Sequence, residues 1–306
     1  MNRIDRSFNE LINELGSLSE KELYHRIRSA FEKVPAETRR SCQDFFNRFG
    51  FWGRLEPENG VYEQIELKEL ELFEHLGDFV WLYGELVDYR SKMTLYAILS
   101  NWYRYDFKST AQAKEYMYDD YFDLDIVSCT PDEVVADLGA FTGDTVRSYI
   151  SSYGGGCYRR MYCYEPSPSS FEKLTQSLAG TRDLVLRQKA VADEPGRLEL
   201  LNHEYASSNR LSDSPGDVEV TTLDLDIEEP LTLIKADIEG SEYRALNGAK
   251  KHIMNEHPKL LISVYHSNED LWRIPRLIHE ISRDYRLHLR YRSSPIYPTE
   301  ICLLAT

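Results

Sequence analysis

The sequence predicts an α/β fold that follows a helical N-terminal region. From about residue 121 onward, short apolar runs alternate with amphipathic stretches, which indicates parallel strands joined by helical crossovers. Residues 1–118 instead carry apolar side chains at helical spacing. At 306 residues the chain is longer than one average domain. We therefore expect a helical region at 1–118 and an α/β domain at 119–306.

Composition excludes several classes of partner. The net charge of −15 divides into about −8 for the first 130 residues and −7 for the rest, so the surface should repel nucleic-acid backbones throughout. No run of 18 apolar residues and no apolar signal core occur, so we expect no membrane insertion and a cytoplasmic location. The five cysteines form no C-x-x-C pair and are expected to be reduced.

The N-terminal region shows local signals of helix start and stop. Phe8, Leu11, Ile12 and Leu15 fall on one helical face, Ser19 and Glu22 form a capping box, and a proline at position 35 interrupts the pattern. A long, aromatic-rich helical stretch is expected over residues 66–105. Such a region suits a helical cap, a dimer face of a homo-oligomer, or a lid that selects substrate.

The expected elements of the second domain are read from apolar runs and caps. Strands are predicted near 134–138, 160–165, 184–192, 231–237, 259–265, 285–292 and 299–305. A hairpin-like pair is predicted near 197–202 and 218–222. Helices are predicted near 143–152, 168–178, 241–255 and 269–283. Ser241 is the expected cap of the third helix, and Gly248 weakens that helix inside.

A glycine turn follows the first strand. Gly139 and Gly143 are separated as G-x-x-x-G, and Glu165 ends the next apolar run, where a carboxylate suits a ribose diol. A dinucleotide fingerprint needs glycine at the position of Phe141 and again at Asp144. A ring and a carboxylate there disfavour pyrophosphate but suit a cationic cofactor. The pattern thus favours S-adenosylmethionine (AdoMet) over NAD.

A second acidic motif follows the strand near 231–237. Asp237 and Glu239 lie at its expected carboxyl end, where open α/β sheets bind ligands, and Lys235 could simply pair with Asp237. His266 follows the next strand and should lie beside these carboxylates if the two strands are neighbours. A histidine beside a carboxylate suits general base catalysis. A divalent metal held by these side chains is the less favoured alternative.

Residues 121–306 resemble the FkbM family of AdoMet-dependent methyltransferases, a class I family with a Rossmann-like, seven-stranded sheet covered by helices on both faces. The matching motifs are D-L-G-A-F-T-G-D-T at 137–145, Y-E-P-S-P at 164–168, T-L-D at 222–224, I-K-A-D-I-E-G-S-E at 234–242 and S-V-Y-H at 263–266. The resemblance implies AdoMet contacts from the turn, from Glu165 and from an adenine-pocket wall near 189–191. The expected cofactor residues are Asp137, Gly139, Ala140, Phe141, Thr142, Gly143, Asp144, Glu165, Pro166, Ala190, Val191 and Asp237.

The resemblance also implies the reaction. Family members mostly methylate hydroxyl oxygens of sugars, glycans or secondary metabolites, so a small molecule or glycan is the expected partner. We expect His266 to act as base, with Asp237 or Glu239 orienting it or the acceptor. Many members carry a glutamate before the final histidine-bearing turn, where this chain has Ser263-Val264-Tyr265. The alternatives are an NAD(P)-dependent oxidoreductase and a catalytically degenerate binding module.

Overall fold

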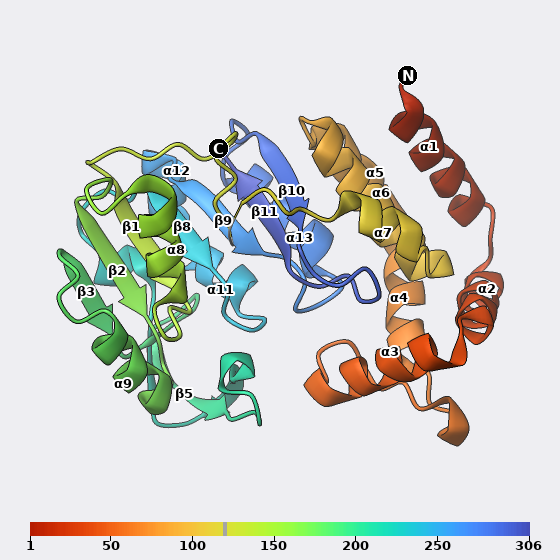
Figure 1. Cartoon of the computed structure of the whole chain (residues 1–306), viewed down its shortest axis with the longest axis horizontal. Coiled ribbons are helices and arrows are strands. Elements are labelled where there is room, and N and C mark those ends of the chain that lie inside the picture. Colours follow the sequence, from red (N-terminus) through yellow and green to blue (C-terminus); the bar gives the residue numbers. More distant parts are fainter. Residues whose placement is uncertain (119–120) are drawn as a thin grey trace. The chain divides into compact units, whose positions relative to one another are not determined.

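The computed structural model describes residues 1–118 and 121–306, which form two compact units (Figure 1). The first unit comprises Met1–Glu115, Val264–Pro275 and Arg286–Cys302, and the second comprises Tyr116–Ser263, Arg276–Tyr285 and Leu303–Thr306. The predicted α/β domain at 119–306 includes Val264–Pro275 and Arg286–Cys302, which the structure assigns to the first unit. Residue 119, where that domain is predicted to begin, lies outside the described residues. Nowhere in the described chain is a helix long and hydrophobic enough for a membrane span.

The first unit is mainly helical, as the sequence predicts. Its helices are α1 (Arg3–Gly16), α2 (Glu20–Lys33), α3 (Ala36–Phe49), α4 (Glu63–Glu74), α5 (Leu76–Glu85), α6 (Tyr89–Arg104) and α7 (Phe107–Ala113). The predicted capping box is confirmed, because the Ser19 hydroxyl accepts from the Glu22 N–H while the Glu22 carboxylate accepts from the Ser19 N–H. On α1 the buried stripe includes Ile4 in addition to Phe8, and Ile12 is only half-buried.

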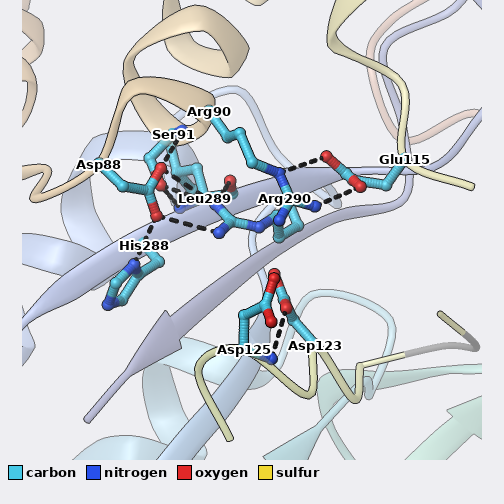
Figure 2. A network of polar contacts seen from close by, with 9 residues as sticks. All are labelled: Asp88, Arg90, Ser91, Glu115, Asp123, Asp125, His288, Leu289 and Arg290. Atoms are coloured by element: carbon cyan, nitrogen blue, oxygen red, sulfur yellow. Dashed lines mark hydrogen bonds and ion pairs between the residues drawn. The ribbon is translucent and has the colours of Figure 1, made fainter. Parts of the chain in front are cut away.

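A polar network fixes the start of α6 against β10 (Leu287–Tyr291) within the first unit (Figure 2). The Asp88 carboxylate accepts hydrogen bonds from the Ser91 N–H at 2.6 Å, from Nδ1 of His288 at 2.8 Å and from Arg290 at 2.9 Å. Burial alone would raise the pKa of Asp88, but these hydrogen bonds hold it below its ordinary value. The network explains why a C-terminal strand belongs with the N-terminal helices.

The main sheet has seven strands, so the predicted fold class is confirmed. Their order is β10-β11-β9-β8-β1-β2-β3, with β1 (Val134–Leu138), β2 (Arg160–Tyr164), β3 (Leu184–Arg187), β8 (Leu233–Ala236), β9 (Lys259–Ser263) and β11 (Ile301–Ala305). Strand β1 is central and pairs in parallel with β2 and with β8. All five residues of β1 are buried, as expected for a strand covered on both faces. Figure 1 shows β1, β2 and β3 side by side in this order.

A four-stranded sheet accompanies the main sheet in the second unit. Its order is β4 (Ala190–Val191), β7 (Val218–Thr221), β5 (Gly196–Leu201) and β6 (Arg210–Pro215). The predicted pair near 197–202 and 218–222 is confirmed as antiparallel β5 and β7. The single strand predicted over 184–192 is wrong, because β3 and β4 belong to different sheets. Strand β6 was not predicted, since its sequence R-L-S-D-S-P has little apolar content.

The helices of the second unit are α8 (Asp144–Tyr153), α9 (Pro168–Ser177), α10 (Leu223–Asp226), α11 (Glu242–Asn247) and α12 (Lys250–Glu256), and α13 (Asp270–Ile281) spans residues of both units. The single helix predicted over 241–255 is therefore wrong. It breaks at Gly248, where a Cβ would lie 2.1 Å from the carbonyl oxygen of Ala192. The close approach of these two backbones requires glycine at the break.

Candidate cofactor site

Most of the predicted cofactor residues lie at the ends of strands β1, β2 and β8 or directly after them, whereas Ala190 and Val191 lie in β4 of the second sheet. Strands β8, β1 and β2 are adjacent and parallel, so the segments that follow them leave from the same edge. The chain runs from β1 outward through β2 and β3, then returns to β8 on the other side of β1. In open α/β sheets, ligands bind at the carboxyl ends of strands where the direction of winding reverses. The direction of winding reverses between the adjacent strands β1 and β8, so their carboxyl ends form such a point.

The turn after β1 makes close backbone contacts with both neighbouring strand ends. The N–H groups of Gly139 and Ala140 both donate to the carbonyl oxygen of Tyr164, at 3.0 and 2.9 Å. Gly139 has a φ of +77°, and a Cβ on it would lie 1.9 Å from the carbonyl oxygen of Asp237. No side chain fits there. Glycine therefore allows the turn after β1 to touch the segment after β8.

Phe141 links this turn to Glu165. Its backbone has a φ of +43°, and its N–H donates to Oε2 of Glu165 at 3.1 Å. The ring occupies the position where a dinucleotide fingerprint has its second glycine, and Asp144, which begins α8, is exposed. A carboxylate at a helix start opposes a pyrophosphate group. The local structure thus retains both features that disfavour a dinucleotide.

Glu165 is a buried carboxylate with spare acceptor capacity. Its side chain is 7% exposed, and Oε1 accepts from the Ser167 N–H at 2.8 Å. Burial raises the pKa of Glu165 to about 7, against the backbone hydrogen bonds that favour the ionised form. Each carboxylate oxygen can accept more than one hydrogen bond. Glu165 can therefore also accept from a pair of ligand hydroxyls.

Beneath the turn lies a buried ion pair. Nζ of Lys235 is 3.1 Å from Oδ1 of Asp137, and the two side chains are 3% and 2% exposed. The ammonium also donates to the carbonyl oxygens of Gly139 at 2.9 Å and Leu138 at 3.2 Å. Burial raises the pKa of Asp137, and the charge of Lys235 opposes that rise. Lys235 therefore holds the carbonyl groups of Leu138 and Gly139 in the turn. Its ion-pair partner Asp137 lies on the neighbouring strand β1, outside the motif at 234–242.

The segment after β8 is held by carboxylates and a tyrosine. The hydroxyl of Tyr121 donates to Oδ2 of Asp237 at 2.6 Å. Glu242 is fully buried and accepts from the N–H groups of Ile238 at 2.7 Å and Gly240 at 3.0 Å. The predicted side-chain cap from Ser241 is wrong, since its side chain makes no cap hydrogen bond with the described residues. Glu242 instead holds the turn that precedes α11, through the N–H groups of Ile238 and Gly240.

Ala190 and Val191, the predicted adenine-pocket residues, form the buried strand β4. The preceding Lys189 places its Nζ 3.0 Å from Oδ1 of Asp226, whose Oδ2 accepts from the Tyr164 hydroxyl at 2.8 Å. Tyr164 is the last residue of β2 and precedes Glu165. A shared carboxylate thus connects the start of β4 to the strand end that carries Glu165.

His266, Asp237 and Glu239 are distributed over both units. His266 belongs to the first unit, where its ring is 3% exposed and lies 5.5 Å from the ring of Phe51. Asp237 and Glu239 belong to the second unit, and Glu239 has a φ of +55°. The expected proximity of His266 to these carboxylates, as base or as metal ligands, therefore stays a prediction.

Tyr121 and Glu242 are site residues whose roles the sequence does not reveal. Tyr121 lies 116 residues before its partner Asp237, so no local pattern connects the two. Its ring centroid also lies 5.3 Å from Nζ of Lys235. Glu242 stands in the acidic motif, but only the fold of the loop shows that it accepts backbone hydrogen bonds.

Comparison with known proteins identifies a family and a similar fold. The model of the methyltransferase FkbM domain matches residues 137–292, just over half of the chain. A crystal structure of a methyltransferase FkbM from Methylobacillus flagellatus KT superposes with a TM-score of 0.68 at 23% identity, covering 81% of this chain. This chain covers only 64% of that protein's length. A comparison with curated proteins gave no significant match.

Two further structures show weaker similarity. An rRNA methylase from Streptococcus thermophilus has a TM-score of 0.38 and 14% identity, covering 58% of this chain and 87% of its own. Fibrillarin from Aeropyrum pernix, in complex with S-adenosyl-L-methionine, has a TM-score of 0.38 and 12% identity, covering 58% and 67%. At these scores neither structure supports an argument about the site.

Proposed function

The chain belongs to the FkbM methyltransferase family, and from this premise we propose that it transfers a methyl group from AdoMet to an acceptor hydroxyl. One observation carries the choice of donor. The turn after β1 has a glycine backbone packed on the segment after β8, but it replaces the remaining fingerprint glycines by Phe141 and Asp144. Such a turn opposes a pyrophosphate.

The residues of the second unit fit AdoMet in charge and in hydrogen-bonding capacity. We propose that Glu165 accepts from the ribose hydroxyls, because it lies beside the Phe141 N–H and keeps free lone pairs. The acidic side chains Asp144 and Asp237 suit a cofactor that carries an ammonium and a sulfonium. Ala190 and Val191 would provide an apolar wall for the adenine ring of AdoMet. When bound, AdoMet supplies an electrophilic methyl carbon.

For the acceptor we propose a hydroxyl group of a sugar, glycan or secondary metabolite. The protein then has two tasks: it must align the acceptor oxygen with the methyl carbon, and it must remove the hydroxyl proton. We propose His266 as the group that takes this proton at an imidazole nitrogen. Asp237 and Glu239 would orient the imidazole or the acceptor.

The proposed base is tested with radiolabelled AdoMet and a panel of sugars and small polyols as acceptors. His266→Ala should lower turnover by about 10²-fold or more, as expected for loss of a general base. Its affinity for AdoMet should stay close to that of the wild type. His25→Ala, which removes an exposed histidine of the same unit, is the matched control. Unchanged turnover in His266→Ala would remove His266 from the mechanism.

A further inference from the structure

A pocket within the first unit contains polar groups that the proposed methyl transfer does not use. The pocket is lined by helices α3, α4 and α6, by the loop after α3, and by the segments Val264–Pro275 and Arg286–Cys302. The lining residues are Phe46, Trp52, Gln64, Lys68, Trp102, Val264, Tyr265, Ser267, Asn268, Pro298, Thr299 and Ile301. All of these residues belong to the first unit. No acidic side chain lines the pocket among the residues that the structure describes.

Lys68 is the charged group of this pocket. It is 2% exposed, and within residues 1–118 and 121–306 it forms neither a hydrogen bond nor an ion pair through its side chain. Its Nζ lies near two aromatic rings, 4.8 Å from the ring centroid of Tyr105 and 5.4 Å from that of Phe46. Burial lowers the pKa of Lys68 to about 8, so the side chain is mostly charged at neutral pH. A buried ammonium without an acceptor is costly.

A second buried polar group lies beside it on the same helix face. Gln64 is four residues before Lys68 on α4 and is 1% exposed. Neither its amide nitrogen nor its amide oxygen has a hydrogen-bond partner in the described part of the chain. Buried polar side chains are normally paired with protein or with ligand. Two such groups on one pocket wall indicate an occupant that accepts hydrogen bonds.

The more exposed side of the pocket adds further donors. Ser267 and Asn268 are half-buried, so the pocket reaches solvent there. The Ser267 oxygen accepts from the Asp270 N–H at 3.2 Å, which leaves the hydroxyl hydrogen for another acceptor. The charge balance matters most: the neighbouring Cys42 thiol is neutral, because burial raises its pKa to about 11. Among the residues that the structure describes, no acidic side chain lines the pocket to balance the positive charge of Lys68.

We propose that this pocket binds a carboxylate group, with one carboxylate oxygen beside Lys68 and Gln64. The cavity volume of about 10 Å³ admits one oxygen-sized group. The remainder of the ligand extends past Ser267 and Asn268. None of the residues proposed for methyl transfer lines the pocket, although Tyr265 and Ser267 flank His266 in the sequence. The carboxylate comes either from a small free acid or from an acidic sugar, and both have the same chemistry inside the pocket.

The test is thermal unfolding of the full chain at neutral pH and constant ionic strength, with chloride replaced stepwise by acetate. Because a ligand of the folded state stabilises it, the Tm should rise by roughly 2–3 °C at about ten times the Kd. Lys68→Met should abolish this rise and Gln64→Leu should reduce it. Lys21→Met, which removes an exposed lysine of α2, should respond like the wild type.

A second arm replaces acetate by glucuronate, a carboxylate carried by a sugar. Stabilisation at lower concentrations of glucuronate than of acetate supports an acidic sugar as occupant, and equal effects support a small free acid. The proposal is overturned if the Tm of the wild type does not depend on either acid, or if Lys68→Met responds as the wild type does. A buried water on Lys68 and Gln64 would then explain the pocket. The wild-type titration alone decides the question if neither pocket variant folds.

Discussion

Replacing Lys235 by methionine tests the ion pair beneath the glycine turn. Methionine fills a similar volume but removes the ammonium, so the Asp137 carboxylate is left buried without a partner. Breaking a buried pair in this way costs about 3–5 kcal/mol, because the remaining charge stays desolvated. The carbonyl oxygens of Leu138 and Gly139 lose their donor as well. We expect a fall of this size in the free energy of unfolding, measured by urea denaturation.

The loss should depend on pH in a direction that identifies its cause. Burial already raises the pKa of Asp137, and removal of Lys235 should raise it further. A carboxyl with a raised folded-state pKa binds its proton more tightly in the folded chain. The stability of the variant should therefore fall as pH rises from the ordinary pKa towards the raised one, by up to ~1.4 kcal/mol per pH unit. The variant should thus be less impaired at about pH 5 than at about pH 8.

Two further variants complete this test. Lys235→Met combined with Asp137→Asn should recover part of the loss, with a coupling energy of about 2 kcal/mol or more in a double-mutant cycle. Arg28→Met removes one member of an exposed pair on α2 and should cost far less. If Lys235→Met is no worse than Arg28→Met, or if its loss is independent of pH, the buried pair does not support the turn.

The remaining predictions concern the turn and Glu165. Gly139→Ala should weaken AdoMet binding and lower the Tm more than Gly180→Ala, because both glycines have positive φ but only Gly139 has a carbonyl oxygen at 1.9 Å from its Cβ position. Equal effects of both variants would mean that strain, not contact with Asp237, is what matters. Glu165→Gln should weaken AdoMet binding by up to about 10²-fold, measured by calorimetry. The control Glu172→Gln, at an exposed glutamate, should bind AdoMet as tightly as the wild type does. AdoMet should bind more tightly as pH rises through about 7, where Glu165 ionises. A flat pH profile in the wild type, or one that persists in Glu165→Gln, would contradict that assignment.

Much of the second unit could be predicted from the sequence because its signals are local. The buried strand at 134–138, the glycines at 139 and 143 and the apolar run before Glu165 each follow from patterns within a few residues. Gly248 could be recognised as a weak point of the predicted helix, but the break there could not be predicted, because it depends on the carbonyl of Ala192, which lies 56 residues earlier. Strand β6 was missed because its polar sequence forms a strand only by pairing with β5.

For the site, too, residues within a local motif could be predicted, but contacts between residues distant in sequence could not. The positions of Phe141 and Asp144 in their motif favour AdoMet over NAD, and Glu165 suits the ribose of either cofactor. The partner of Lys235 could not be read in the same way, because Asp137 lies on the neighbouring strand and Asp237 in the same motif is the nearer carboxylate in sequence. Tyr121 carries no motif, and only the fold shows its hydrogen bond to Asp237.

Calorimetric titration of the full chain with AdoMet, and separately with NADH, tests the central claim most directly. We predict saturable binding of one AdoMet per chain, weakened in Glu165→Gln, and no saturable binding of NADH. Saturable binding of NADH without binding of AdoMet would contradict it, because the turn at Phe141 and Asp144 would then accept a pyrophosphate after all.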